Sequence, residues 1–146
     1  MMARRVQIRA LGALVLVVGL GCRVAAGQSG QAIKVGGMCD RTGPTRVIGT
    51  ELCPGVADYI ALVNKKGGVL GHKLEYTELE HGYMVPRAVE AYEQLKRDGA
   101  VTFFTYGVPT LLGLAPHCME DNLPPFNPGT GRSYFIDGMT WPYIFP

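Results

Sequence analysis

The stretch "KVGGMCDRTGPTRVIG", residues 34–49, joins a short apolar segment to a turn rich in threonine, glycine and proline. Its first part predicts a strand over residues 33–38 that is apolar enough for the interior of a parallel sheet. Cys39 and Asp40 follow directly, which raises the question of a catalytic pair. No histidine lies in this loop, so a thiol nucleophile would need His81 from a neighbouring loop as its base. We therefore favour a loop that holds a ligand without changing it.

The rest of the chain alternates helix and strand patterns. Apolar spacing predicts helices over residues 50–66, 86–99 and 109–121, and strands over residues 73–79, 101–106 and 123–127. The first of these strands alternates polar and apolar residues, as expected of an edge strand, whereas residues 101–106 are apolar on both faces and should be central. The order is βαβαβαβ, so the predicted fold class is α/β, a doubly wound parallel sheet with helices on both faces.

Three details of these elements can be tested against a structure. Pro54 is tolerated only near the start of a helix, so we place that start near Thr50. The third helix should turn Leu111, Leu112, Leu114 and Ala115 inward. The apolar residues from Trp141 to Phe145 begin a fifth strand.

The N-terminus predicts export. Residues 1–5 are positively charged, residues 11–20 are an unbroken apolar run, and Val24-Ala25-Ala26 supplies small residues for a signal peptidase. We predict that residues 1–26 are a signal peptide and that residues 27–146 are the mature, periplasmic or extracytoplasmic chain. Cys22, which follows Gly21, offers the alternative of a lipid anchor.

Charge and cysteine content exclude several functions. Removing residues 1–26 takes away four arginines and no acidic residue, so the net charge changes from +2 to −2. The remaining basic residues are dispersed, which argues against a nucleic-acid partner. Cys39, Cys53 and Cys118 allow at most one disulfide, and its pairing is left open. The spacing of cysteines and histidines matches no metal motif, and we predict neither a metal site nor a cofactor.

Ligands of such sheets bind at the carboxyl ends of the strands. Here that edge is formed by residues 39–49, 80–85, 106–109 and 127–132, and three of these four loops are rich in glycine, threonine and proline. Such loops bring backbone N–H groups close to a ligand. Gly129-Thr130-Gly131 lacks the spacing of a dinucleotide or nucleoside triphosphate motif, so no nucleotide is predicted.

Several segments together resemble the periplasmic branched-chain amino acid-binding protein family, the solute receptors of amino acid and amide ABC transporters. They are, in order, "DRTGP" (40–44), "NKKGGVLGHKLE" (64–75), "PRAVEAYEQL" (86–95), "LAPHCMEDNLPPFNPGTG" (114–131) and "WPYIFP" (141–146). The resemblance covers nearly everything after Ala32. Each motif is short, but five in the right order are fairly specific.

The resemblance implies a type I periplasmic-binding-protein fold with two lobes, of which this chain holds part of the first, truncated at Pro146. It implies a small ligand, an amino acid or amide, and ABC permease subunits as partners. The predicted ligand-binding residues are Ile48, Gly107, Val108, Thr110, Asn127, Gly129, Thr130 and Gly131. Val108 stands where the family has a serine, Phe104 where it has a glycine, and Asn127 where it has a serine. These departures leave the identity of the ligand open.

Two other classes use the same fold. A ligand-sensing ectodomain would bind the same kind of ligand for signalling rather than transport. An exported α/β enzyme would need an activated Cys39, which would react fast with a thiol reagent at neutral pH.

We expect the exported product to begin at Gly27 or Gln28, because Val24-Ala25-Ala26 fits the signal peptidase and the apolar run is too short to span a bilayer. The intact mass of the secreted chain measures this directly. A new N-terminus at a lipid-modified Cys22 would contradict the prediction.

Overall fold

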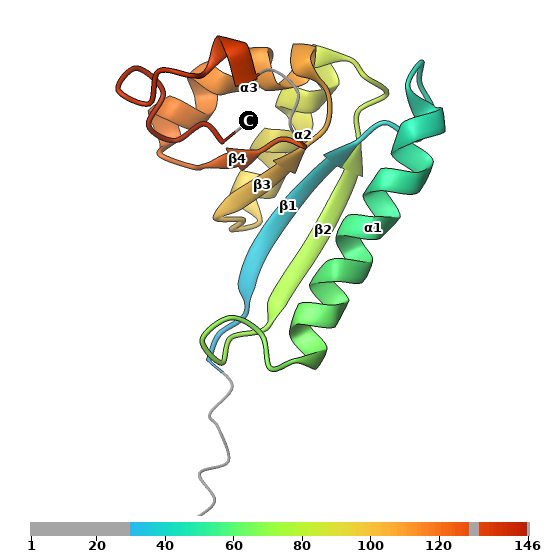
Figure 1. Cartoon of the computed structure of the whole chain (residues 1–146), viewed down its shortest axis with the longest axis vertical. Coiled ribbons are helices and arrows are strands. Elements are labelled where there is room, and N and C mark those ends of the chain that lie inside the picture. Colours follow the sequence, from blue (N-terminus) through green and yellow to red (C-terminus); the bar gives the residue numbers. More distant parts are fainter. Residues whose placement is uncertain (1–29, 129–131, 146) are drawn as a thin grey trace, which may run out of the picture.

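The computed structural model describes residues 30–128 and 132–145 of the 146-residue chain. The strands are β1 (Ile33–Cys39), β2 (Leu74–Glu80), β3 (Thr102–Thr105) and β4 (Pro125–Phe126), and the helices are α1 (Arg46–Lys65), α2 (Val85–Arg97), α3 (Val108–Asp121) and the short 3₁₀ helix η1 (Arg132–Tyr134). All paired strands are parallel, in the order β2-β1-β3-β4 (Figure 1). The predicted α/β fold with a parallel sheet is therefore confirmed, with β2 at an edge and β3 inside. The predicted signal peptide lies outside the described residues.

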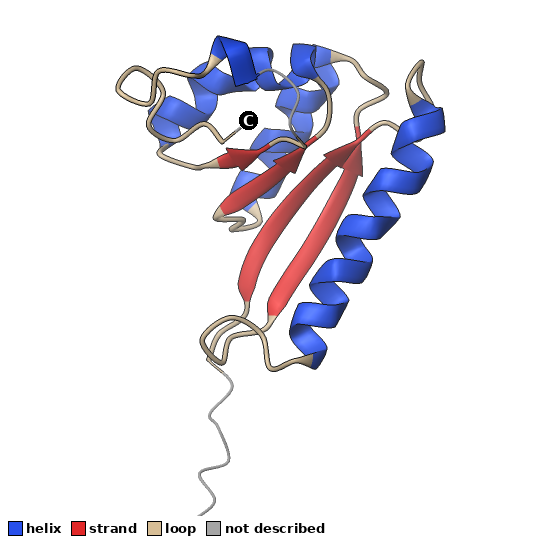
Figure 2. Ribbon diagram, viewed as in Figure 1, coloured by secondary structure: helices blue, strands red, loops and turns tan. Residues whose placement is uncertain are grey.

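The core lies between the sheet and the two helices α2 and α3, while α1 runs along the other face beside β2 (Figure 2). Met38 and Phe103 from the sheet pack there against Tyr92, Leu95 and other fully buried side chains of the two helices. The absence of a side chain at Gly36 makes this packing close, because a Cβ atom would stand 2.7 Å from the Phe103 ring. Helix α2 thus approaches the middle of β1 directly, since the same Cβ atom would stand 2.9 Å from Leu95.

Helix α1 begins at Arg46, one turn before the predicted start near Thr50. The prediction was wrong because the turn before the helix is closed by the Asp40 carboxylate, which accepts hydrogen bonds from Gly43 and Thr45. Helical geometry can therefore start directly after Thr45. Pro54 then lies well inside α1, where it cannot donate a backbone hydrogen bond.

The C-terminal part also differs from the prediction. The strand expected over residues 123–127 shrinks to Pro125–Phe126, because neither Pro124 nor Pro125 has an N–H for a ladder. The expected fifth strand is a single parallel bridge between Phe126 and Phe145. Ile144 is buried in the core rather than presented at an edge.

Helix α3 turns three of the four predicted residues inward. Leu111, Leu114 and Ala115 are buried, together with Thr110 and Cys118. Leu112 is 41% exposed, so its predicted inward position was wrong. The buried positions 111, 114, 115 and 118 follow the helical repeat and place Leu112 at the margin of that stripe.

A disulfide joins Cys39, the last residue of β1, to Cys53 on α1, and Cys118 is free and buried. This answers the pairing that the sequence left open. The disulfide matters to α1 because only Gly49 and Cys53 of that helix are buried. The apolar residues spaced along one side of this helix, among them Leu52 and Val56, are only half-buried. Among the described helices, none has both the length and the hydropathy needed to cross a membrane.

We expect removal of this disulfide to destabilise α1 first. The double variant Cys39→Ser, Cys53→Ser should lower the free energy of unfolding by about 3 kcal/mol, because the closed loop is about 15 residues long. Amide hydrogen exchange should rise more over residues 46–65 than over α2, whose buried stripe is intact.

A matched control is Cys118→Ala, which removes the free thiol and keeps the disulfide. Reductant should lower the melting temperature of wild type and of Cys118→Ala, and leave the double variant unchanged. Equal reductant sensitivity in all three proteins would contradict the role assigned to the disulfide.

Candidate functional site

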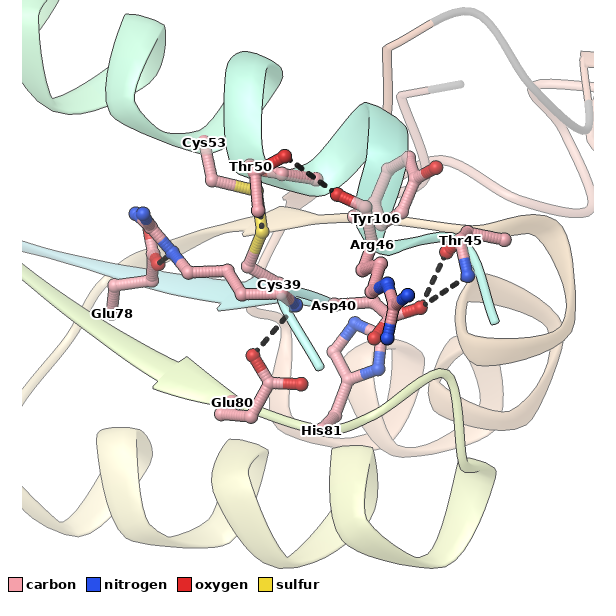
Figure 3. The surroundings of a disulfide bond; sticks show 12 residues. Cys39, Asp40, Thr45, Arg46, Thr50, Cys53, Glu78, Glu80, His81 and Tyr106 are labelled. Atoms are coloured by element: carbon pink, nitrogen blue, oxygen red, sulfur yellow. Dashed lines mark hydrogen bonds and ion pairs between the residues drawn. A yellow bond between two sulfur atoms is a disulfide. The ribbon is translucent and has the colours of Figure 1, made fainter. Parts of the chain in front are cut away.

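The carboxyl edge of the sheet is built around the buried side chain of Asp40. Its carboxylate accepts hydrogen bonds from the Gly43 N–H at 2.5 Å, the Thr45 N–H at 2.8 Å and the Thr45 hydroxyl at 2.6 Å (Figure 3). Burial raises the pKa of Asp40, but these hydrogen bonds lower it by more, so the carboxyl titrates below its ordinary 3.8. Asp40 thus closes the turn of residues 40–45 as an ionised carboxylate.

Two further carboxylates at this edge are also engaged. Glu80 accepts hydrogen bonds from the N–H groups of Arg41 and Gly82 and from the Thr42 hydroxyl. Glu78 forms an ion pair with Arg41, with 2.7 Å between Oε1 and Nε. The charges of this region therefore serve to fix the loop after β1.

The sulfurs of Cys39 and Cys53 lie within 4.8 Å of the Glu78 carboxylate, a grouping that can in principle hold a metal ion. Both sulfurs are consumed by the disulfide, and Glu78 is paired with Arg41. The cluster is therefore not a metal site in this structure. For the same reason Cys39 carries no free thiol, and the thiol nucleophile weighed above is not formed.

The predicted binding residues after β3 converge at the start of α3. Gly107 precedes the helix with a φ of 99°, a conformation that favours glycine. The Thr110 hydroxyl is turned inward and donates to the carbonyls of Tyr106 and Gly107. For the N–H groups of Val108 and Thr110, the described residues offer no backbone acceptor. These two donors, at the positive end of a helix, are what this loop offers to a ligand.

Asn127 is brought to the same place from β4. It is buried, and its Nδ2 donates to the carbonyl and hydroxyl of Thr105 and, at 3.5 Å, to the Gly107 carbonyl. Its amide therefore ties the loop after β4 to the start of α3. Gly129, Thr130 and Gly131, the other predicted residues of this loop, lie outside the described residues.

Ile48 lies apart from these residues, on the first turn of α1. Its side chain is 56% exposed, and Val47 beside it is 78% exposed. Both belong to the same carboxyl edge of the sheet, because α1 begins just after β1. The structure thus leaves Ile48 accessible, as a pocket position requires, without showing a contact to Val108 or Asn127.

The loop between β2 and α2 contains two residues that sequence reasoning did not assign to the site. His81 is fully buried and follows the last residue of β2. The ring of Tyr83 lies against Gly107 and against Tyr106, with 6.1 Å between the two tyrosine ring centroids. The sequence signal was the histidine in a glycine-containing loop at the ligand edge, which we had considered only as a base for Cys39.

These observations indicate the class of protein. The chain forms a parallel α/β lobe, and the carboxyl edge of its sheet has backbone N–H donors and carboxylates that are already hydrogen-bonded within the protein. Ligands of such sheets bind at this edge. Residues 32–146 match the periplasmic binding protein family. The chain belongs to this family. The resemblance noted in the sequence is therefore confirmed.

Solved structures agree with this assignment. A protein of the Pseudomonas fluorescens group, described as an ABC transporter permease, matches 79% of this chain at 29% identity and a TM-score of 0.70. A fatty acid ABC transporter substrate-binding protein from Thermomonospora curvata matches 70% of this chain at 25% identity, with a TM-score of 0.63. A branched-chain amino acid transporter substrate-binding protein from Streptococcus pneumoniae was solved in complex with isoleucine. It matches 78% of this chain at 16% identity, with a TM-score of 0.66.

The chain spans 26% to 33% of the length of these three proteins. No curated protein matches it significantly. The match therefore concerns one part of a larger fold, and the identity to the isoleucine complex supports the fold alone.

We expect Asp40→Asn to lower the free energy of unfolding by about 2 kcal/mol at neutral pH, because hydrogen bonds to a charged acceptor are lost or weakened. Since the folded state lowers the pKa of Asp40, the stabilisation is present above its ordinary pKa of 3.8 and is lost as pH falls below it. Denaturant titrations at several pH values should show this acid loss in wild type and a flatter profile in the variant.

The control is Asp137→Asn. Asp137 also accepts hydrogen bonds from a threonine hydroxyl and a backbone N–H, those of Thr140 and Met139, but it is exposed. Its replacement should cost clearly less than that of Asp40. An equal cost for the two variants would show that burial of Asp40 adds nothing.

Proposed function

We propose that this chain supplies the first lobe of an extracytoplasmic solute-binding receptor of an ABC importer, and that the solute is an amino acid or a related small amide. The permease subunits of such an importer would be its partners. Membership of the periplasmic binding protein family supports the solute-binding role. The amino acid or amide as ligand class rests on the five sequence segments that resemble the branched-chain amino acid-binding family.

The observation that carries the proposal is the start of α3. Val108 and Thr110 present N–H groups with no described backbone acceptor at the positive end of a 14-residue helix. Such a terminus favours a carboxylate or an amide carbonyl. Asn127 ties the start of the loop after β4 to Gly107. Gly129, Thr130 and Gly131, which lie outside the described residues, stay predicted ligand-binding residues of that loop. Ile48 would contact the body of the ligand from α1.

The fold also suits reversible binding rather than chemistry. The one cysteine at this edge is in a disulfide, and the buried Asp40 carboxylate is saturated by its own turn. Because these groups are committed, the ligand would be held by donors and apolar contacts without a covalent step.

We expect Val108→Pro to weaken ligand binding about 10- to 100-fold, because it deletes one N–H directed at an anionic group. Proline is well tolerated at the first position of a helix, so the fold should survive. Isothermal titration of the chain against branched-chain amino acids, small amides and a fatty acid measures the effect.

Val108→Ala is the matched control, since it shortens the same side chain and retains the N–H. It should bind within about threefold of wild type, as expected for loss of a peripheral apolar contact. Equal losses in both variants would show that the side chain matters rather than the N–H, and tight binding of the fatty acid alone would replace the proposed ligand class.

A further inference from the structure

The turn between β2 and α2 has a strained backbone. His81 to Met84 form a turn closed by the Met84 N–H, which donates to the His81 carbonyl at 3.0 Å. Its two central residues, Gly82 and Tyr83, have φ values of 59° and 62°. Positive φ is natural for glycine and uncommon for tyrosine, so Tyr83 must be held in this conformation by other contacts.

One of these contacts comes from the imidazole of His81. The Tyr83 N–H donates to His81 Nδ1 at 2.9 Å. Nδ1 must therefore be unprotonated and the proton must be on Nε2, which has no hydrogen-bond partner among the described residues. The side chain acts as an asparagine does in an Asx turn, where a side-chain acceptor binds the N–H two residues later.

A second contact joins this turn to the proposed ligand site. The Tyr83 ring lies so close to Gly107 that a Cβ atom there would stand 2.5 Å from the ring. It also packs edge-on against Tyr106. Gly107 is the N-cap of α3, so the Tyr83 ring lies against the residue that precedes the free N–H groups of the helix.

We propose that neutral His81 is a positioning residue: by accepting the Tyr83 N–H it holds the Tyr83 ring against Gly107, and protonation of the imidazole releases that ring from the start of α3. This inference rests on the proposed function for its consequence in binding. The structural part stands on the turn alone. An imidazolium has donors on both nitrogens, so Nδ1–H would face the Tyr83 N–H and the bond would be replaced by repulsion.

Charged and titratable groups from several elements surround the imidazole. They are Asp40 after β1, Glu80 and Tyr83 on its own segment, Tyr106 after β3, and Arg87 of α2, which reaches Gly82. Burial lowers the pKa of His81 below its ordinary 6.5, and Glu80, Asp40 and the carbonyls of Tyr106 and Met38 only partly offset it. The turn should therefore be intact above pH 6.5 and open in a more acidic range.

The test follows the backbone amides of Tyr83 and Gly107 by NMR between about pH 7.5 and about pH 5. In wild type both signals should shift together with one midpoint below pH 6.5. In His81→Asn, which keeps a δ-position acceptor and cannot titrate, neither signal should show the transition. In His81→Leu, the Tyr83 amide should resemble the acidic state at every pH. His117→Asn removes another histidine and should retain the wild-type transition.

Measurements of ligand affinity provide a second test, independent of the NMR titration. For a solute found by the titration panel, the affinity of wild type should fall about tenfold between the two pH limits. The His81→Asn variant should lose this pH dependence. Absence of the coupled amide transition in wild type, or its persistence in His81→Asn, would overturn the inference. A panel without any binder would overturn the proposed function alone, because the amide transition needs no ligand.

Discussion

The buried carboxylate of Asp40 is the interaction on which the carboxyl edge depends. A charged group without solvent is costly unless it is saturated with hydrogen bonds, and here the following turn supplies three. Those bonds close a turn over residues 40–45, so that α1 begins at Arg46. Gly49 then packs on the Asp40 backbone so closely that a Cβ atom would lie 1.7 Å from its carbonyl oxygen. The first turns of α1 are thus placed by Asp40, which follows β1, together with the disulfide from Cys39.

The sequence was sufficient for the order of the elements and the sheet type, because each rests on a local repeat. In the helix predicted over residues 86–99, Ala88, Tyr92 and Leu95 follow the helical period and are buried. The boundaries of helices and strands were less predictable where they depend on a hydrogen bond or on a single proline. Asp40 moved the start of α1, and Pro125 limited β4 to two residues. Neither effect is visible in apolar periodicity.

The site could be predicted only in part, for a related reason. Gly107 and Asn127 were predicted from the family resemblance, in loops expected to meet at one edge of the sheet, and the structure joins them through the Asn127 amide. The role of Tyr83 depends on its positive φ and on the contact of its ring with Gly107. The spacing of residues in the sequence predicts neither feature. The disulfide likewise required the distance of 6.4 Å between the Cα atoms of Cys39 and Cys53, since three cysteines allowed three pairings.

The distribution of charge at this edge indicates which end of a ligand it can take. Asp40 and Glu80 accept three hydrogen bonds each, and Glu78 is paired with Arg41. Within the described residues, these three carboxylates are therefore committed to the protein, whereas the start of α3 has donors to offer. A zwitterionic ligand would direct its carboxylate here, since an ammonium would find only saturated acceptors. Neutral His81 fits the same logic, because an added positive charge would strengthen anion binding electrostatically and yet destroy the turn that shapes the site. In the proposed mechanism, the loss of this donor geometry outweighs the effect of the added charge.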